Sequence, residues 1–109
     1  MSKDYNAMAR TLQKKVVSMM EDLKAERGWT QKQLAAELGI TTRAIQLYNN
    51  GINLPDFSVI IAFCDVSGIG LDALRYENCS LRDAELYNLI MSLSPSKKDS
   101  LINFLRKDE

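Results

Sequence analysis

Residues 30–51 read TQKQLAAELGITTRAIQLYNNG, and this stretch decides the fold. Residues 30–33 have the pattern of a capping box, in which a hydroxyl and an amide satisfy free backbone donors at a helix start. Leucine and alanine then recur at helical spacing until Gly39, a residue suited to the left-handed position after a helix. Thr41-Thr42 supplies a threonine N-cap for a second helix, which ends near Asn50-Gly51. The stretch therefore predicts two short helices joined by a turn at Gly39.

Two short helices with such a turn have the geometry of a helix-turn-helix. At about 100° per residue, Ile45 and Tyr48 lie on one side of the second helix and should pack inward. The opposite side carries Arg43, Gln46, Leu47 and Asn50. Arginine can form paired hydrogen bonds with a guanine edge, glutamine can do so with adenine, and an aliphatic group can meet a thymine methyl. A solvated surface is the alternative interpretation of this face, but the helix-turn-helix context favours contact with DNA.

The remainder of the sequence is also helical in pattern. Apolar residues recur in steps of three and four from Tyr5 to Leu23, which predicts a long helix that ends at Gly28. Asp56 can cap a helix over the apolar run at 59–64, although Val and Ile also allow a buried strand there. A short helix is expected over 71–76 and two capped helices after residue 80. The apolar stripe of these last two helices comprises Leu86, Leu89, Ile90, Leu93, Leu101, Ile102 and Leu105.

Several motifs in one register carry a resemblance to a known family. They are LKAERGWTQKQLA at 23–35, GITTRAIQLYNNG at 39–51 with its Y-x-N-G ending, Pro55, and GIGLDAL at 68–74. Over residues 14–76 the chain resembles the lambda-repressor-like, Cro/C1-type (XRE) helix-turn-helix family. The resemblance implies an all-α, five-helix DNA-binding domain from a bacterial or phage transcriptional regulator, here followed by a C-terminal pair of helices.

The resemblance also implies roles for single residues. Ala35, Gly39 and Ile45 match structural positions of the two helices and their turn. Gln31 matches a position that grips phosphate, and Asn50 matches a backbone contact. The positions that reach phosphates or base edges from the recognition helix are Thr41, Thr42, Arg43, Gln46 and Leu47. The DNA-binding set is therefore expected to be Gln31, Thr41, Thr42, Arg43, Gln46, Leu47 and Asn50.

Two positions depart from the pattern of the family. Relatives commonly carry glutamate where Asn49 stands, paired with a basic residue on the first helix, and Lys24 occupies the place of that partner. The pair is expected to be a hydrogen bond at best. Relatives also place Lys or Arg after Gly51 to clamp phosphate, whereas this chain has Ile52, Asn53 and Leu54. Ile52 and Leu54 either contact a protein or fold under the domain.

Composition narrows the classes of function. Basic and acidic residues balance at 14 each, and the first 54 residues hold the positive excess. The chain has no histidine, two cysteines and no phosphate-binding glycine loop, so neither a catalytic site nor a metal site is expected. The longest apolar run is too short for a membrane helix or a signal peptide. We expect a cytoplasmic protein with reduced thiols that is not an enzyme and needs no cofactor or small-molecule ligand.

The sequence thus predicts two parts. Residues 1–79 form the helix-turn-helix domain with an extended first helix, and residues 80–109 form a helical hairpin. The apolar stripe of this hairpin must either cover the domain or meet a second copy, and the need for a dimer favours a dimerisation element. The function expected is a sequence-specific regulator, a repressor that binds a two-fold operator in double-stranded DNA as a homodimer. The alternative is a protein-interaction module on the same scaffold, such as an antirepressor or an antitoxin-like protein, since the loop after Gly51 lacks cations.

Overall fold

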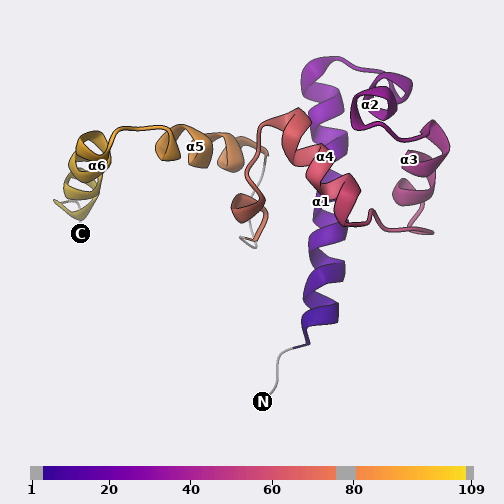
Figure 1. The fold of residues 1–109 in the computed structure, drawn as a ribbon, viewed down its shortest axis with the longest axis horizontal. Coiled ribbons are helices and arrows are strands. Elements are labelled where there is room, and N and C mark those ends of the chain that lie inside the picture. Colours follow the sequence, from indigo (N-terminus) through magenta and orange to yellow (C-terminus); the bar gives the residue numbers. More distant parts are fainter. Residues whose placement is uncertain (1–3, 76–80, 108–109) are drawn as a thin grey trace.

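The computed structural model describes residues 4–75 and 81–107. Its elements in chain order are α1 (Tyr5–Arg27), α2 (Gln31–Leu38), α3 (Thr42–Asn49), α4 (Phe57–Ser67), a short 3-10 helix η1 (Leu71–Arg75), α5 (Leu81–Met91) and α6 (Pro95–Lys107) (Figure 1). Within these residues there are helices and no strands, which confirms the all-α prediction. The strand interpretation of residues 59–64 is wrong, because the run lies inside α4.

Helix α4 forms because its start and its buried face are both specified. The Asp56 side chain accepts a hydrogen bond from the backbone N–H of Val59 at 3.1 Å and caps the first turn. Val59, Ile60 and Phe63 recur at helical spacing and are buried, so the apolar run packs one face against the core. The cap and the spacing outweigh the preference of Val and Ile for strands.

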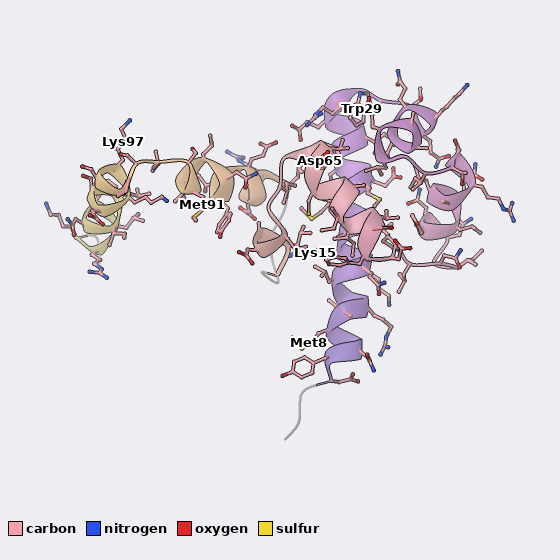
Figure 2. The ribbon with its side chains drawn as sticks, viewed as in Figure 1. Met8, Lys15, Trp29, Asp65, Met91 and Lys97 are labelled. Carbon is pink, nitrogen blue, oxygen red and sulfur yellow. The ribbon has the colours of Figure 1, made fainter. Side chains whose placement is uncertain are left out.

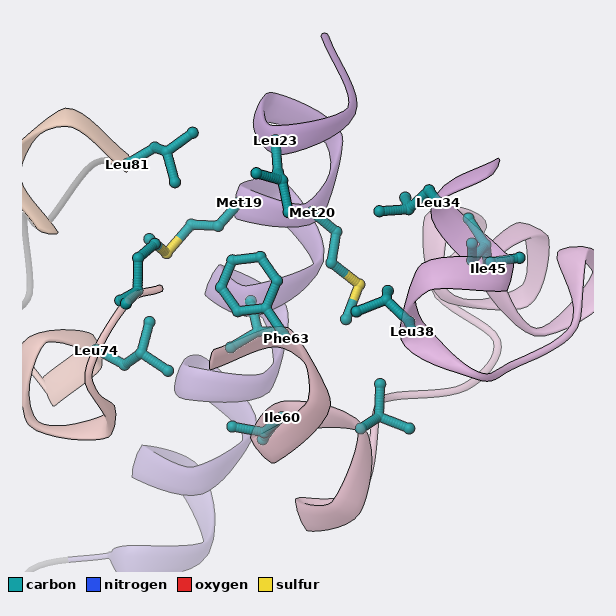
Figure 3. Close-up of a cluster of buried hydrophobic side chains, with 14 of the residues drawn as sticks. Met19, Met20, Leu23, Leu34, Leu38, Ile45, Ile60, Phe63, Leu74 and Leu81 are labelled. Atoms are coloured by element: carbon teal, nitrogen blue, oxygen red, sulfur yellow. The ribbon is translucent and has the colours of Figure 1, made fainter. Parts of the chain in front are cut away.

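The core lies where α1 meets α2, α4 and η1 (Figure 3). Phe63 has no exposed surface, and in the close-up it points toward the methionines of α1. Trp29 packs partly buried against this cluster, and the Arg27 guanidinium lies 5.3 Å from its ring centroid. The buried apolar side chains are Val16, Met19, Met20, Leu23, Leu34, Ala35, Leu38, Ile45, Val59, Ile60, Phe63, Ile69, Ala73, Leu74 and Leu81.

The first turns of α1 extend beyond the body of the domain (Figure 1). Two side-chain bonds anchor the helix further along: Gln13 Nε2 donates to the Pro55 carbonyl at 2.8 Å, and Lys15 Nζ donates to the Leu74 carbonyl at 3.3 Å. Figure 2 labels Lys15 beside the body and Met8 below it, where α1 stands free. We call residues 5–11 the α1 overhang, which matches the expectation of a protruding first helix.

The last two helices leave the body on the side opposite α2 and α3, and we call residues 81–107 the C-terminal arm (Figure 1). The expected domain boundary near residues 78–80 lies outside the described residues. Leu81, directly after it, belongs to the core, and the Asn88 side-chain amide donates to the Gly68 carbonyl, so α5 is attached to the domain. Helix α6 has no buried residue and turns away from α5 instead of folding back along it, so the single chain does not form the expected hairpin.

Among the described residues, no helix combines the length and the apolar character needed to cross a membrane.

Candidate nucleic-acid interface

The turn between α2 and α3 is fixed by its backbone. Gly39 adopts a left-handed conformation with φ 70°, which is strained for residues with a side chain. Its N–H donates to the Ala36 carbonyl at 3.2 Å, and the N–H of Ile40 donates to the Ala35 carbonyl at 3.0 Å. Ile40 then packs partly buried against the core. These contacts hold the start of α3 in a defined place relative to α2.

Both helices of the motif begin with a threonine cap. Thr30 Oγ1 accepts from the N–H of Gln33 at 3.1 Å while Gln33 Oε1 accepts from the N–H of Thr30 at 2.7 Å, which confirms the capping box. Thr41 Oγ1 accepts from the N–H of Ala44 at 3.0 Å. The remaining first-turn N–H groups have no acceptor within their helices. Because such groups and the helix dipole attract anions, each helix start can hold a DNA phosphate.

Helix α3 separates an inner face from an outer face as predicted. Ile45 is 1% exposed, and Tyr48 packs partly buried against the core. Burial, with the nearby Asp56 charge, raises the pKa of the Tyr48 hydroxyl, so this side chain is neutral at physiological pH. Arg43 and Gln46 are exposed on the other side. The inner face therefore fixes the rotation of α3 and turns its outer face to solvent.

The expected DNA-binding residues lie on connected parts of the motif. Thr41, Arg43, Gln46 and Asn50 are exposed, whereas Gln31, Thr42 and Leu47 are half-buried. All except Gln31 belong to α3 or directly flank it. Arg43 forms no ion pair with any described residue, so its guanidinium is available to a ligand.

One side-chain contact joins the two helices of the motif on this surface. Gln46 Nε2 donates to Gln31 Oε1 at 3.5 Å, which is a long hydrogen bond. No sequence pattern indicates this contact, since the two residues lie 15 positions apart on different helices. The bond brings a residue expected to grip phosphate next to one expected to contact a base.

The end of α3 is tied to α1 through a carboxylate that the sequence analysis did not identify. Asn49 Nδ2 donates to Glu21 Oε1 at 2.8 Å, and Lys24 Nζ pairs with Glu21 Oε2 at 2.9 Å. The expected direct bond between Asn49 and Lys24 is therefore replaced by a bridge through Glu21. The position of Glu21, one turn before Lys24 on the same helix, was the available signal.

The environment of Glu21 favours its charged form. Partial burial raises the pKa of the carboxyl, but hydrogen bonds from Lys24 and Asn49 and the Lys24 charge lower it by more. The resulting pKa lies below the usual value of a glutamate. The bridge is therefore intact at neutral pH and is lost in acid.

The loop after α3 carries apolar groups where relatives carry cations. Ile52 is 66% exposed, whereas Leu54 is half-buried, so only Leu54 folds partly under the domain. Leu54 and Tyr48 line a cleft of about 290 Å³ beside α1, with Lys14 and Val17 on its other wall. Nothing in this loop provides a cation for a phosphate.

No cluster of three or more Cys, Asp or Glu side chains in residues 4–75 and 81–107 is placed to hold a metal ion. Burial raises the pKa of the Cys64 thiol, so the thiol is protonated at neutral pH. The surface of α2 and α3 is the candidate site, and its donors suit a polyanion.

This geometry defines a helix-turn-helix domain of the DNA-binding class. A family model described as Helix-turn-helix, of the Cro/C1 type, matches residues 19–74, which is more than half of the chain. The chain belongs to the Cro/C1-type helix-turn-helix family, and it is a DNA-binding helix-turn-helix regulator. No curated protein and no solved structure matches the chain.

Proposed function

We propose that this protein is a sequence-specific transcriptional repressor that binds a two-fold operator in double-stranded DNA as a homodimer. The observation that carries the proposal is the outer face of α3, where Arg43 and Gln46 are exposed while Ile45 is buried. The side chains offered to solvent are those that distinguish bases in the major groove. Repression is the simplest mode of action, because occupying the operator is sufficient for it.

Each part of the motif has a distinct role in this proposal. Arg43 contacts a guanine, Gln46 contacts an adenine and Leu47 meets a thymine methyl. Gln31, Thr41 and Thr42 hold phosphates at the starts of α2 and α3, and Asn50 contacts the backbone just beyond α3. Since phosphate contacts carry no sequence information, the discrimination between sites rests on Arg43, Gln46 and Leu47.

A homodimer is proposed because one recognition helix covers only a few base pairs. The C-terminal arm lies away from α2 and α3 and exposes large apolar side chains, so it offers a surface for a second copy that leaves the motif open. We also propose that the protein is cytoplasmic, because it then has direct access to its operator.

Selection of bound duplexes from a random DNA pool tests the proposal. We expect an inverted repeat whose half-sites are centred about 10 base pairs apart, as a dimer requires. A salt titration should give a shallow slope in the plot of the logarithm of the DNA-binding constant against the logarithm of the salt concentration. Each neutralised phosphate contributes about −0.9 to this slope, and the loop after α3 has no cations to neutralise phosphates. Absence of binding to any duplex at low salt would contradict the proposal.

One observation favours a second candidate, a protein-binding role on the same scaffold. Exposed Ile52 lies beside the apolar cleft lined by Val17, Tyr48 and Leu54. A partner that inserts an apolar side chain there would explain why the loop lacks cations. In that case Ile52→Asp abolishes a protein complex and Arg43→Ala leaves DNA affinity unchanged. If the protein is a repressor, Arg43→Ala lowers DNA affinity and Ile52→Asp does not.

A further inference from the structure

Two parts of the chain keep large apolar side chains in solvent. On the α1 overhang, Tyr5 and Met8 are 71% and 55% exposed. They cannot be covered by the arm of the same chain, because Leu81 and Asn88 fix α5 to the body and the arm leads away from α1 (Figure 1). The exposed large apolar side chains of the arm are Leu86, Leu89, Met91, Ile102, Phe104 and Leu105.

The exposed apolar side chains of the α1 overhang lie on one face of the helix. Tyr5, Met8 and Leu12 recur at i, i+3 and i+7 on one face, and only Leu12 is packed against the core of its own chain. The Asp4 side chain accepts from the N–H of Ala7 at 3.0 Å and caps the free end. Since a helix end without tertiary contacts is marginal in water, a partner for this face would stabilise it.

The C-terminal arm carries an apolar groove of a size that suits this face. Leu86 and Leu89 line a groove of about 330 Å³ on α5, bordered by the polar side chains of Arg82, Asp83 and Glu85. An apolar floor with a polar border is the composition of a protein interface. The overhang spans about 10 Å along its axis at 1.5 Å per residue, and α5 spans about 16 Å, so the overhang fits along α5.

Building on the homodimer of the proposed function, we propose that the α1 overhang of each copy docks in the α5 groove of the other. A two-fold axis makes this contact twice, because each copy provides one overhang and one groove. Both overhangs and both grooves are then occupied in the dimer. The contact covers Tyr5, Met8, Leu86 and Leu89 of each copy, at roughly 60–120 Å² each, which removes roughly 240–480 Å² of apolar surface per copy. That area is below the roughly 800 Å² per partner of a standard interface, so we expect a weak dimer that forms at high protein concentration.

Mixing two weakened variants of the full chain tests the reciprocal contact. Met8→Lys alters only the overhang, and Leu89→Glu alters only the groove. Each variant alone should raise the dimer dissociation constant at least tenfold, because both contacts of its homodimer are altered. In an equimolar mixture one contact is wild-type and the other joins opposite charges, so dimers should reappear with an affinity within about threefold of wild type.

Asn6→Lys is the matched control, because it adds the same charge to an exposed position on the other side of the overhang. It should leave the dissociation constant unchanged. Sedimentation equilibrium without DNA gives the constants, and circular dichroism checks that the variants stay helical. Dimers lost with Leu89→Glu but kept with Met8→Lys would overturn the proposal in favour of contact between two arms. A wild-type chain that sediments as a monomer throughout would also overturn it.

A single half-site duplex separates this inference from the proposed function. Binding of one copy to one half-site needs only α2 and α3, so Met8→Lys and Leu89→Glu should bind it as the wild type does. If the wild type dimerises but binds no duplex, the DNA-binding proposal fails while the reciprocal contact stands.

Discussion

Helices α3 and α6 are both amphipathic, yet α3 packs its apolar face into the domain whereas α6 leaves its apolar face in solvent. Helix α3 has only 8 residues, but Ile45 is 1% exposed, and Thr41 caps its start. Helix α6 has 13 residues and buries none of them. Isolated helices of either length are marginal in water, so a helix is held by the place of its apolar face more than by its length. In the function that we propose, a helix that contacts DNA has to be held by its own domain, whereas the exposed apolar face of α6 is open to a partner.

The largest test of this comparison removes one phenylalanine from each region. Phe63→Ala, at the fully buried centre of the core, should lower the free energy of unfolding by about 3–5 kcal/mol. Phe104→Ala, at a side chain that is 63% exposed on α6, should change it by less than about 0.5 kcal/mol in the monomer. Urea denaturation at low protein concentration measures both. Equal losses would show that α6 is part of the folded core.

Two truncations separate the contributions of α5 and α6. A chain that ends at residue 93 keeps Leu81 in the core, so its monomer should be as stable as the full chain. A chain that ends at Cys79 exposes the cluster that Leu81 covers and should lose about 1.5–3 kcal/mol.

The same truncations should also affect assembly. The 93-residue chain keeps the α1 overhang and the α5 groove and should dimerise as the full chain does, whereas the chain that ends at Cys79 lacks the groove and should be monomeric. Operator affinity should fall at least tenfold for the shorter chain and little for the 93-residue chain. If the shorter chain still sediments as a dimer, the arm is not the dimerisation element.

On the side of α3, the largest effect is expected from Arg43. Arg43→Ala should cost about 1–3 kcal/mol at the selected operator and relax preference at one base pair, because a bidentate contact to guanine is lost. Leu47→Ala should have a smaller effect, since only an apolar contact with a thymine methyl is removed. Titrations against matched and scrambled operators measure the loss. An equal loss on both would show that Arg43 does not contact a base.

The sequence predicted the elements whose causes are local. At Thr30, Thr41 and Asp56, the capping side chain accepts from a backbone N–H only three residues further along the chain. The inward position of Ile45 followed from helical periodicity and from the resemblance to the family. These features need no knowledge of distant parts of the chain.

Features that depend on tertiary placement were not predictable in the same way. The bridge from Asn49 to Glu21 spans 28 positions, and its existence depends on how the tertiary fold places α1 beside the end of α3. The exposure of Ile52 and the half-burial of Leu54 could not be separated, because both are apolar residues in the same loop. The path of the C-terminal arm depends on the attachment of α5 at Leu81, which no sequence pattern indicated.

The bond between Gln31 and Gln46 leads to a smaller effect on DNA recognition. If Gln31 contacted only phosphate, Gln31→Ala would weaken binding to all DNA sequences alike. Because Gln31 Oε1 accepts from Gln46 Nε2, the substitution should also free Gln46 and reduce discrimination at its base pair. A double-mutant cycle with Gln46→Ala should give a coupling of about 0.5–1 kcal/mol on the operator and less on scrambled DNA. Strict additivity on the operator would show that the two amides act independently.

The smallest expected effect concerns how α1 holds the end of α3. The pKa of Glu21 is lowered in the folded protein, so its charge contributes stability above the unfolded value of 4.5, and that contribution is lost as the pH falls through the lower folded value. The Glu21 side chain is 36% exposed, so solvent screening limits the contribution to about 0.5 kcal/mol. Glu21→Gln keeps an oxygen for Asn49 and removes the charge.

The stability of the Glu21→Gln variant should therefore be closer to wild type at pH 3 than at pH 7. Asp22→Asn, at an exposed neighbour with no hydrogen bond to α3, is the matched control and should show no such difference. Urea denaturation at both pH values gives the comparison. Operator affinity at pH 7 should fall slightly for Glu21→Gln alone, because Asn49 then loses a charged acceptor and the end of α3 is held less firmly. A variant with unchanged pH dependence of stability would mean that packing alone holds that end of the helix.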